Sequence, residues 1–274
     1  LVVTHEDNPN ENIWFASVRR VCEEHGIPVI TPENPNTPEV EQRVAALQAD
    51  FLFSFYYRHM LKAPLLESAT HGAYNMHGSL LPKYRGRVPI NWAVLHGERE
   101  TGATLHQMTE KPDNGAIVDQ YAVPILPDDT AQEVFEKVTV AAELCLCRAL
   151  PGLIDGTAEH RPQDLSQGGY FGGRKAEDGR IDWRQNARQI HNLVRAVTHP
   201  YPGAFSDLDA GRLVLWRTRV VADDAASPFC GQILRRDGRI EIYPAGGGIL
   251  HVLEAELSGT PLVVSDVRLP LTVC

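Results

Sequence analysis

The chain has 274 residues, of which 43% are hydrophobic and 22% are charged, and these are ordinary values for a globular protein. This length can bury a core in one large domain or in two unequal ones. The formal net charge of −9 comes without a basic run, which weighs against nucleic-acid binding, and the sequence shows neither an 18-residue apolar stretch nor a signal peptide.

The first half of the chain predicts strands that alternate with helices. Apolar runs predict strands at residues 1–4, 28–30, 50–55 and 73–76, and amphipathic stretches predict helices at residues 10–24, 37–47, 60–69 and 89–95. Thr37 is placed to cap the second helix, with Pro38 at its first position. This alternation implies βαβ units and a mostly parallel sheet with helices on both faces.

The middle of the chain predicts two longer strands and one long helix. The strands are expected at residues 102–108 and 116–123, on either side of a turn-rich segment. Residues 130–133 (TAQE) form a capping box that opens the helix. Residues 166–179 are rich in glycine and charge and indicate a mobile loop, and a further helix is expected near residues 186–197.

After Gly203 the pattern changes to short β runs separated by turn signals. These runs lie at residues 213–221, 232–234, 239–243 and 250–257. They predict a small antiparallel domain that resembles a barrel of the OB type. We therefore expect a catalytic domain at residues 1–163, a loop and connecting helix at residues 164–203, and a β domain at residues 204–274.

The start of the chain and its cysteines carry two further expectations. The first residue is Leu1 rather than Met and already lies in a predicted strand, so we expect a missing N-terminal segment. The cysteines are odd in number and lack metal-ligand spacing; they stand at positions 22, 145, 147, 230 and 274. We interpret all five as reduced thiols, which indicates the cytoplasm, and we expect no metal site.

A dense polar cluster follows the strand predicted at residues 73–76. Asn75 and His77 lie two apart in an extended run, so both side chains leave the same face. A neutral imidazole beside an amide suits attack on a carbonyl, because the ring takes a proton and the amide N–H stabilises the developing oxyanion. The alternative is a strand-end histidine that hydrogen-bonds a loop and an asparagine that forms a turn, and the two residues alone leave both interpretations open.

Asp113 lies in residues 111–115 (KPDNG), whose residue types are those of a β-turn. The functional alternative is that its carboxylate faces His77, holds the ring and raises the pKa of His77 toward or above neutrality. Spacing alone does not establish that contact. His96 and His106 lie in helical or β patterns without evident partners, so we interpret them as core or surface residues.

Three features together resemble the signature of the folate-dependent formyltransferases. They are residues 75–82 (NMHGSLLP), the Arg85-Gly86 pair that follows, and Asp113 two residues before Gly115. The resemblance implies that Asn75, His77 and Asp113 are catalytic. It also implies a Rossmann-like catalytic domain and a reaction in which 10-formyltetrahydrofolate donates a formyl group to a primary amine without a metal.

Further stretches are similar to the family members that formylate UDP-4-amino-4-deoxy-L-arabinose, a nucleotide sugar used in lipid A modification and polymyxin resistance. They are residues 54–59 (SFYYRH), 81–87 (LPKYRGR), 194–197 (VRAV) and 202–205 (PGAF). The likeness begins at residues 4–9 (THEDNP) and is looser after Arg219. In those members a first strand and helix precede the point where this chain starts, and a decarboxylase domain follows, so fusion to or association with a decarboxylase is an expectation.

The resemblance also assigns residues to the formyl donor. It places the pterin along His59, Met60 and Leu61 and along Thr109, Glu110, Lys111 and Pro112, with Arg87 nearby. The alternative for the first group is a helix start, and for Arg87 a solvated loop charge. Residues 172–175 (GGRK) depart from the Gly-Arg-Arg run that the family has there, which leaves the contacts to the amine substrate open.

Three other functions compete with sugar formylation. Methionyl-tRNA formyltransferase shares the signature, but the region from Ala204 onward has seven Arg, no Lys and nine acidic residues, which argues against tRNA. A formyltetrahydrofolate hydrolase would use water in place of the amine. A non-catalytic folate- or nucleotide-binding module would be expected to lack one of the three catalytic positions. The sequence fixes neither the sugar nor the oligomeric state.

Overall fold

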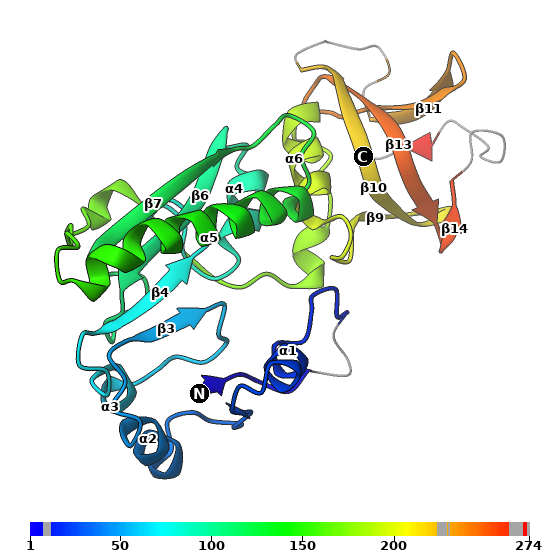
Figure 1. The fold of residues 1–274 in the computed structure, drawn as a ribbon. Helices are drawn as coiled ribbons and strands as arrows, with labels where there is room; N and C mark the ends of the chain where they lie inside the picture. Colours follow the sequence, from blue (N-terminus) through cyan, green and yellow to red (C-terminus); the bar gives the residue numbers. More distant parts are fainter. Residues whose placement is uncertain (8–11, 224–228, 230, 263–270, 273–274) are drawn as a thin grey trace. The chain divides into compact units, whose positions relative to one another are not determined.

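The computed structural model describes residues 1–7, 12–223, 229, 231–262 and 271–272, which form two compact units (Figure 1). Unit 1 contains Leu1–Arg87, Gly102–Val123 and Val138–Phe171, and unit 2 contains Val88–Thr101, Pro124–Lys137 and the described part of Gly172–Cys274. Residues 8–11, Cys230 and Cys274, on which some of the expectations above fall, lie outside the described residues.

Unit 1 is built on a mixed sheet. Its four strands lie in the order β3 (Leu52–Phe55), β4 (Ala73–His77), β6 (Glu100–Gln107) and β7 (Ile117–Pro124). β3 runs parallel to β4, whereas β6 runs antiparallel to β4. A separate parallel pair joins β1 (Val2–Val3) to β2 (Val29–Ile30). The α/β class is confirmed, and β6 makes the four-stranded sheet a mixed one.

Two of the N-terminal helices are shorter than predicted. Helix α1 covers Val18–Glu24, and residues 12–17 of the helix predicted at residues 10–24 lie outside it, because the Ser17 side chain caps α1 by accepting a hydrogen bond from the Arg20 N–H. Helix α3 covers only Ala63–Leu66. The Asn36 side chain donates to the Met60 carbonyl (2.9 Å) and accepts from the Lys62 N–H (2.8 Å), which holds residues 60–62 outside the helix.

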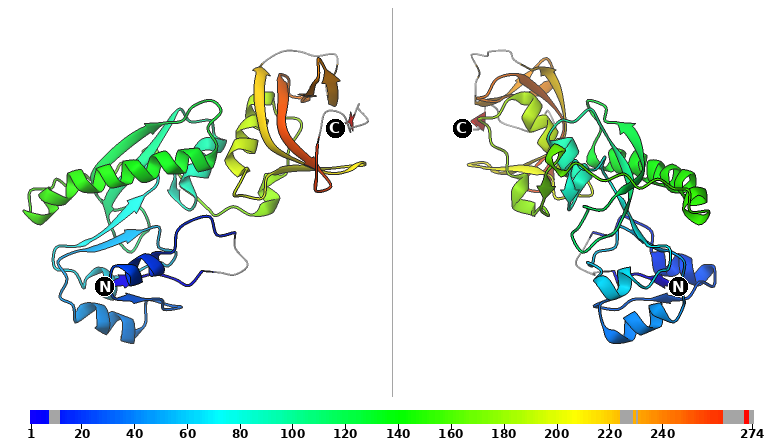
Figure 2. Two further views of the ribbon diagram at one scale, coloured as in Figure 1. Left: turned by 45° about the vertical axis from the view of Figure 1, so that its right-hand side comes forward. Right: turned by 90° about the vertical axis from the view of Figure 1, so that its left-hand side faces the viewer.

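The caps of α2 and α5 are confirmed. In α2 (Pro38–Ala45) the Thr37 side chain accepts from the Val40 N–H. Before α5 (Ala131–Ile154) the Thr130 N–H donates to Glu133 Oε2 (2.7 Å), and the Glu133 N–H donates to Thr130 Oγ1 (3.2 Å). Within unit 1, α5 lies along the sheet (Figures 1 and 2), where Arg148 pairs with Asp119 of β7.

Unit 2 carries the antiparallel sheet that was predicted for the end of the chain. Its strands lie in the order β15 (Leu271–Thr272), β11 (Gln232–Arg236), β12 (Arg239–Tyr243), β13 (Ile249–Leu257), β10 (Gly211–Ala222) and β9 (Ala204–Leu208), and β14 (Thr260–Pro261) pairs with β13. Helix α6 (Ala187–Val197) packs on β10, and α4 (Pro89–Leu95) packs on α6. Side chains such as Leu215, Ile242 and Leu250 form the core of this sheet.

Polar side chains of α6 are buried in unit 2. The Arg195 guanidinium donates to the carbonyls of Asp129 (3.0 Å) and Val94 (3.2 Å). The His191 ring donates from Nε2 to the Pro127 carbonyl (3.0 Å). Because Arg195 and His191 are at most 5% exposed, these bonds satisfy groups that water does not reach. They tie α6 to the two earlier segments of the chain that belong to unit 2.

Residues 166–179, which were predicted to form a mobile loop, include short regular elements. The segment contains two short 3-10 helices, η1 (Leu165–Gln167) and η2 (Ala176–Gly179), and the strand β8 (Tyr170–Phe171). β8 pairs in parallel with β5 (Arg85–Gly86), and the Arg85 N–H donates to the Gly169 carbonyl (3.0 Å). Glycine allows close approach at two positions here, since a Cβ at Gly86 would lie against the Phe171 carbonyl oxygen and a Cβ at Gly168 against the Pro82 carbonyl oxygen.

None of the helices in the described part of the chain has the length and apolar character that a membrane crossing requires.

Candidate active site

Asn75 and His77 lie on one face of β4, as their spacing predicts. The register of β4 with β6 places Asn75 opposite His106 and His77 opposite Thr104. On the other side, Ser54 of β3 lies beside Asn75. Residues opposite one another in a sheet share a face, so Asn75, His77 and His106 gather on the same surface of the sheet.

The His77 ring is fixed by contacts at both of its nitrogens. Nε2 donates a hydrogen bond to the Tyr84 carbonyl (2.8 Å), and Nδ1 lies 3.5 Å from Asp113 Oδ1. The neutral ring therefore carries its proton on Nε2 and can accept another on Nδ1, beside the carboxylate.

Burial governs the pKa of His77. The residue is 6% exposed, and loss of hydration lowers the pKa of the ring from its usual value, although the Asp113 charge acts in the opposite direction. The expectation that Asp113 raises this pKa toward or above neutrality is wrong, because burial outweighs the carboxylate. His77 is therefore neutral at pH 7 and available as a base.

Asp113 reaches across to His77, the contact that sequence spacing left open. Its Oδ2 accepts a hydrogen bond from the Gly86 N–H (2.7 Å), and its side chain is 11% exposed. Burial acts to raise the pKa of the carboxyl, but the two neighbouring imidazoles and the Gly86 N–H act the other way and lower it. Asp113 is therefore ionised at neutral pH while it faces His77.

His106 belongs to this cluster: it is buried in the core, as the sequence interpretation allowed, but it has hydrogen-bond partners that the sequence did not show. Its Nδ1–H donates to the Gln107 carbonyl (2.9 Å), so Nε2 is left as an acceptor, and Asn75 Nδ2 lies 3.1 Å from it. Nε2 also lies 3.6 Å from Asp113 Oδ1, which is longer than a hydrogen bond. The sequence shows only that His106 lies in a predicted strand. The pairing of β6 with β4 is what reveals that His106 lies opposite Asn75.

Gly115 closes the turn that carries Asp113. A Cβ at this position would lie against the Gln107 carbonyl oxygen, well inside van der Waals contact, and a backbone atom cannot move away cheaply. By contrast, a Cβ at Gly172 would meet nothing within 4 Å.

We expect Gly115→Ala to destabilise the protein by about 1–3 kcal/mol, because the added methyl group overpacks the turn. Thermal unfolding should show a midpoint lower by several degrees. Gly172→Ala is the matched control and should leave the midpoint unchanged. A Gly115→Ala midpoint equal to that of the control would show that the turn has room for a side chain.

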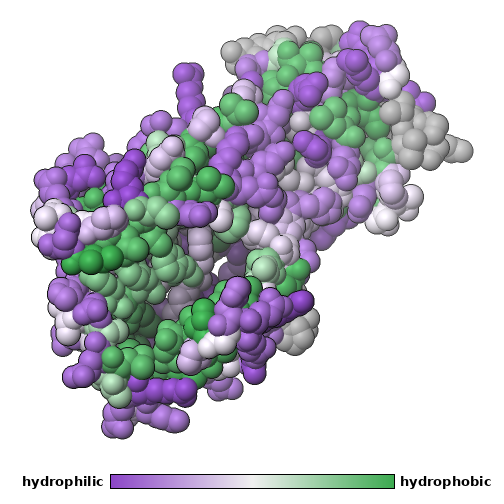
Figure 3. All heavy atoms as spheres, viewed as in Figure 1, coloured by the Kyte–Doolittle hydropathy of each residue, from purple (hydrophilic) through white to green (hydrophobic). Residues whose placement is uncertain are grey.

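The residues assigned to the formyl donor lie on three loops. His59, Met60 and Leu61 follow the carboxyl end of β3, residues 109–112 follow β6, and Arg87 follows β5, with an exposed side chain. The loop after β3 presents apolar surface, since Phe55, Tyr56 and Met60 are 46–55% exposed. Figure 3 shows apolar surface gathered around a hollow over this part of unit 1.

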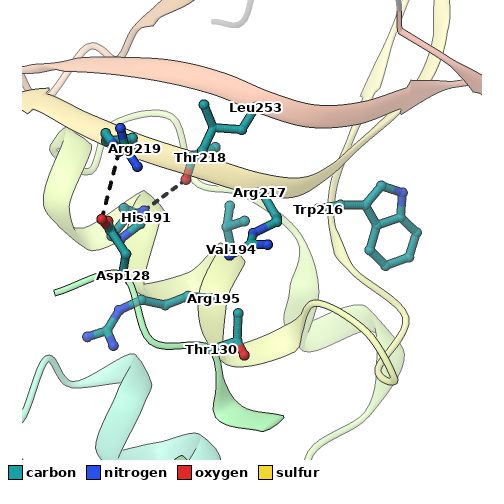
Figure 4. Close-up of a pocket in the computed structure, with 10 residues that line it drawn as sticks. All are labelled: Asp128, Thr130, His191, Val194, Arg195, Trp216, Arg217, Thr218, Arg219 and Leu253. Atoms are coloured by element: carbon teal, nitrogen blue, oxygen red, sulfur yellow. Dashed lines mark hydrogen bonds and ion pairs between the residues drawn. The ribbon is translucent and has the colours of Figure 1, made fainter. Parts of the chain in front are cut away.

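A pocket in unit 2 lies between α6, β10 and the loop before α5 (Figure 4). His191 lines it, with Nδ1 2.9 Å from Thr218 Oγ1 and Nε2 3.4 Å from Asp128 Oδ1. Both ring nitrogens are engaged, because Nε2 also bonds the Pro127 carbonyl. We therefore assign His191 a structural role. Among the described residues, no group of three His, Cys, Asp or Glu side chains is arranged to hold a metal ion.

His191 makes a testable contribution to the pH dependence of stability. Burial is the largest cause that lowers its pKa from 6.5 in the folded state, so the unfolded chain binds this proton more readily. The stability from neutral His191 is complete above pH 6.5 and is lost as the pH falls below it, by at most about 1.4 kcal/mol per pH unit.

The free energy of unfolding, measured by urea titration from pH 7.5 to 5, should fall more steeply for the wild type than for His191→Gln. His25→Gln, at the exposed end of α1, is the control and should keep the wild-type slope. Equal slopes for His191→Gln and the wild type would contradict the assignment.

The fold and the cluster define a class of protein. A buried neutral imidazole with a proton-accepting nitrogen, next to an amide donor and an ionised carboxylate, is suited to acyl-group transfer. The family model "Formyl transferase" matches residues 1–150, and "Formyl transferase, C-terminal domain" matches residues 174–266. The chain belongs to the formyl transferase family.

Solved structures share the fold at low identity. An N-formyltransferase from Helicobacter canadensis, in complex with folinic acid and dTDP-3-aminofucose, is 21% identical with a TM-score of 0.67, over 90% of this chain and 86% of that one. WlaRD, a sugar 3N-formyl transferase in the presence of dTDP and 5-N-formyl-THF, is 18% identical with a TM-score of 0.69, over 92% and 86%. HypX from Aquifex aeolicus, in complex with tetrahydrofolic acid, is 20% identical with a TM-score of 0.63, over 93% and 43%.

Proposed function

We propose that this protein transfers a formyl group from 10-formyltetrahydrofolate to the primary amine of a nucleotide-linked amino sugar. The observation that carries the proposal is the cluster of half-buried Asn75, buried His77 and half-buried Asp113 in a chain of the formyl transferase family. Similar solved structures support the substrate classes, because one is an N-formyltransferase in complex with folinic acid and dTDP-3-aminofucose and another is a sugar 3N-formyl transferase in the presence of 5-N-formyl-THF.

In this proposal each residue of the cluster has a distinct role. His77 Nδ1 accepts the proton that the amine loses as its nitrogen bonds the formyl carbon, and later returns a proton to the departing nitrogen of the donor. Asp113 faces the positive charge that His77 then carries. Asn75 gives one amide N–H to His106, which leaves its second N–H to stabilise negative charge on the formyl oxygen.

The donor fits the surface beside this cluster. A pterin is flat and apolar on its faces, with polar edges, so it suits a loop that exposes Phe55, Tyr56 and Met60 beside backbone groups. The register of β3 with β4 brings the end of β3 next to Asn75. We propose that residues 59–61, residues 109–112 and Arg87 form the folate site. The donor bound there supplies the formyl group.

The acceptor is proposed to be UDP-4-amino-4-deoxy-L-arabinose, as in the formyltransferase domain of the bifunctional enzyme that also decarboxylates UDP-glucuronic acid. Support comes from the sequence likeness at residues 54–59, 81–87, 194–197 and 202–205. The proposal includes the role in lipid A modification and an association with a decarboxylase. Cys22, Cys145 and Cys147 are free thiols, which fits a cytoplasmic setting.

A formylation assay with 10-formyltetrahydrofolate and a panel of acceptors tests the function. The panel contains UDP-4-amino-4-deoxy-L-arabinose, dTDP-linked 3-amino and 4-amino sugars, initiator Met-tRNA and a reaction without acceptor. Formamide on a nucleotide sugar supports the proposal, and preference for another sugar overturns only the choice of sugar. If only the tRNA is formylated, the protein is a methionyl-tRNA formyltransferase. If formate is released without an acceptor, it is a formyltetrahydrofolate hydrolase. Either result would overturn the proposed function.

A further inference from the structure

Gln163 holds the turn that carries Asp113, although it lies 50 positions further along the chain. Its side-chain nitrogen Nε2 donates to the Asp113 carbonyl (2.9 Å) and to the Gly115 carbonyl (2.7 Å). An amide nitrogen has two hydrogens, so these two bonds use the full donor capacity of Gln163. The two carbonyls lie on either side of Asn114, so the two hydrogen bonds from the Gln163 amide hold the turn in one conformation.

The orientation of the Gln163 amide follows from these contacts. If the amide were rotated by half a turn, its oxygen would face two carbonyl oxygens, so only the observed orientation is allowed. The oxygen Oε1 is buried and has no hydrogen-bond partner among the described residues. The side chain is thus positioned by its donors, at the cost of an unsatisfied acceptor, which buried polar groups generally avoid.

The backbone conformation of this turn explains why it needs hydrogen bonds from a distant side chain. Asp113 has φ = 55°, in the left-handed region that most L-residues avoid, although aspartate tolerates it better than most. In this conformation the carboxylate reaches Gly86 N–H with Oδ2 and faces His77 Nδ1 with Oδ1. A relaxed φ would swing the carboxylate away from both groups.

We propose that Gln163 is a positioning residue that sets the direction of the Asp113 carboxylate toward His77. This inference rests on the proposed formyl transfer, since it assigns Gln163 to the same site. Gln163 acts on the main chain of the turn and reaches His77 only through Asp113. Its loss should therefore change the rate of the chemical step and the pKa of His77 rather than substrate binding.

Two substitutions separate the donor function from packing. Gln163→Glu keeps the shape and replaces the double donor by oxygens that face the two carbonyls, and Gln163→Met keeps the length and removes all hydrogen bonding. We expect kcat to fall about 10–100-fold in both, with KM for each substrate within about threefold of the wild type. Gln167→Glu, an exposed change in the same segment, is the control and should keep the wild-type kcat.

A second readout does not depend on catalysis. The Asp113 charge raises the pKa of His77, so a displaced carboxylate should lower that pKa further in Gln163→Met, which adds no charge of its own. NMR titration of the His77 ring measures this shift, and thermal unfolding confirms that the variants are folded. If the wild type transfers formyl groups while folded Gln163 variants keep its kcat and Gln163→Met keeps its His77 pKa, the positioning role is wrong. If the wild type itself does not transfer formyl groups, the proposed function fails, and the titration still decides whether Gln163 positions Asp113.

Discussion

Replacing His77 with alanine is expected to lower the rate of formyl transfer by about 10²–10⁴-fold, the usual contribution of a general acid–base. The reason is that Nδ1 of this ring is the proton acceptor in the proposed reaction, and Asn75 cannot take that role, because an amide is not a base at neutral pH. The measurement is kcat for the sugar acceptor under saturating donor.

His71→Ala is the matched control for this experiment. His71 precedes the same strand, and its side chain is 60% exposed, so the variant should keep the wild-type rate. The unfolding midpoint of His77→Ala must be compared with that of the wild type, because the change removes the hydrogen bond from His77 to the Tyr84 carbonyl. A folded His77→Ala enzyme with a rate close to the wild type would rule out His77 as the base.

Asp113→Asn should produce the second large loss, about 10²–10⁴-fold in kcat, because it keeps the shape of the turn and removes the charge that orients and stabilises the imidazolium. It should also move the pH profile. The Asp113 charge raises the pKa of His77, so its removal lowers that pKa, and the acid limb of kcat shifts to lower pH.

The control for this variant is Asp164→Asn, an exposed carboxylate in unit 1 that accepts hydrogen bonds from Ser166. Both the rate and the acid limb of Asp164→Asn should match the wild type. An Asp113→Asn profile that moves to higher pH would mean that the carboxylate does not act on His77 as the geometry indicates.

Local signals in the sequence predicted much of the fold. The caps at Thr37 and Thr130 lie where their side chains predicted them, and the strand at Arg239–Tyr243 and the helix ending at Val197 match closely. In these elements the residues that decide the structure are neighbours in the chain. The predictions for α1 and α3 were wrong about where the helices begin, and for α3 the deciding contact comes from Asn36, more than twenty residues away.

In the site, too, contacts between neighbours in the chain were predictable and contacts between distant residues were not. Asn75 and His77 share one strand, so their common face followed from the alternation of side chains. His106 joins them through the register of β4 with β6, and Gln163, the last residue of the predicted catalytic domain, joins them through side-chain hydrogen bonds to the turn of Asp113. Neither contact leaves a local pattern, so a single sequence could not show that β4, β6 and Gln163 meet at the turn of Asp113.

The hydrogen bonds from Arg195 of α6 to the carbonyls of Asp129 and Val94 limit which fragments of the chain can fold or be exchanged with a relative. A fragment that starts at Gly172 would leave the Arg195 guanidinium buried without those acceptors, although the C-terminal family model begins only two residues later. Such a fragment should not fold on its own. An exchange of this half with a relative would have to carry Val88–Thr101 and Pro124–Lys137 along with it, so recombination at a single crossover cannot transfer it intact.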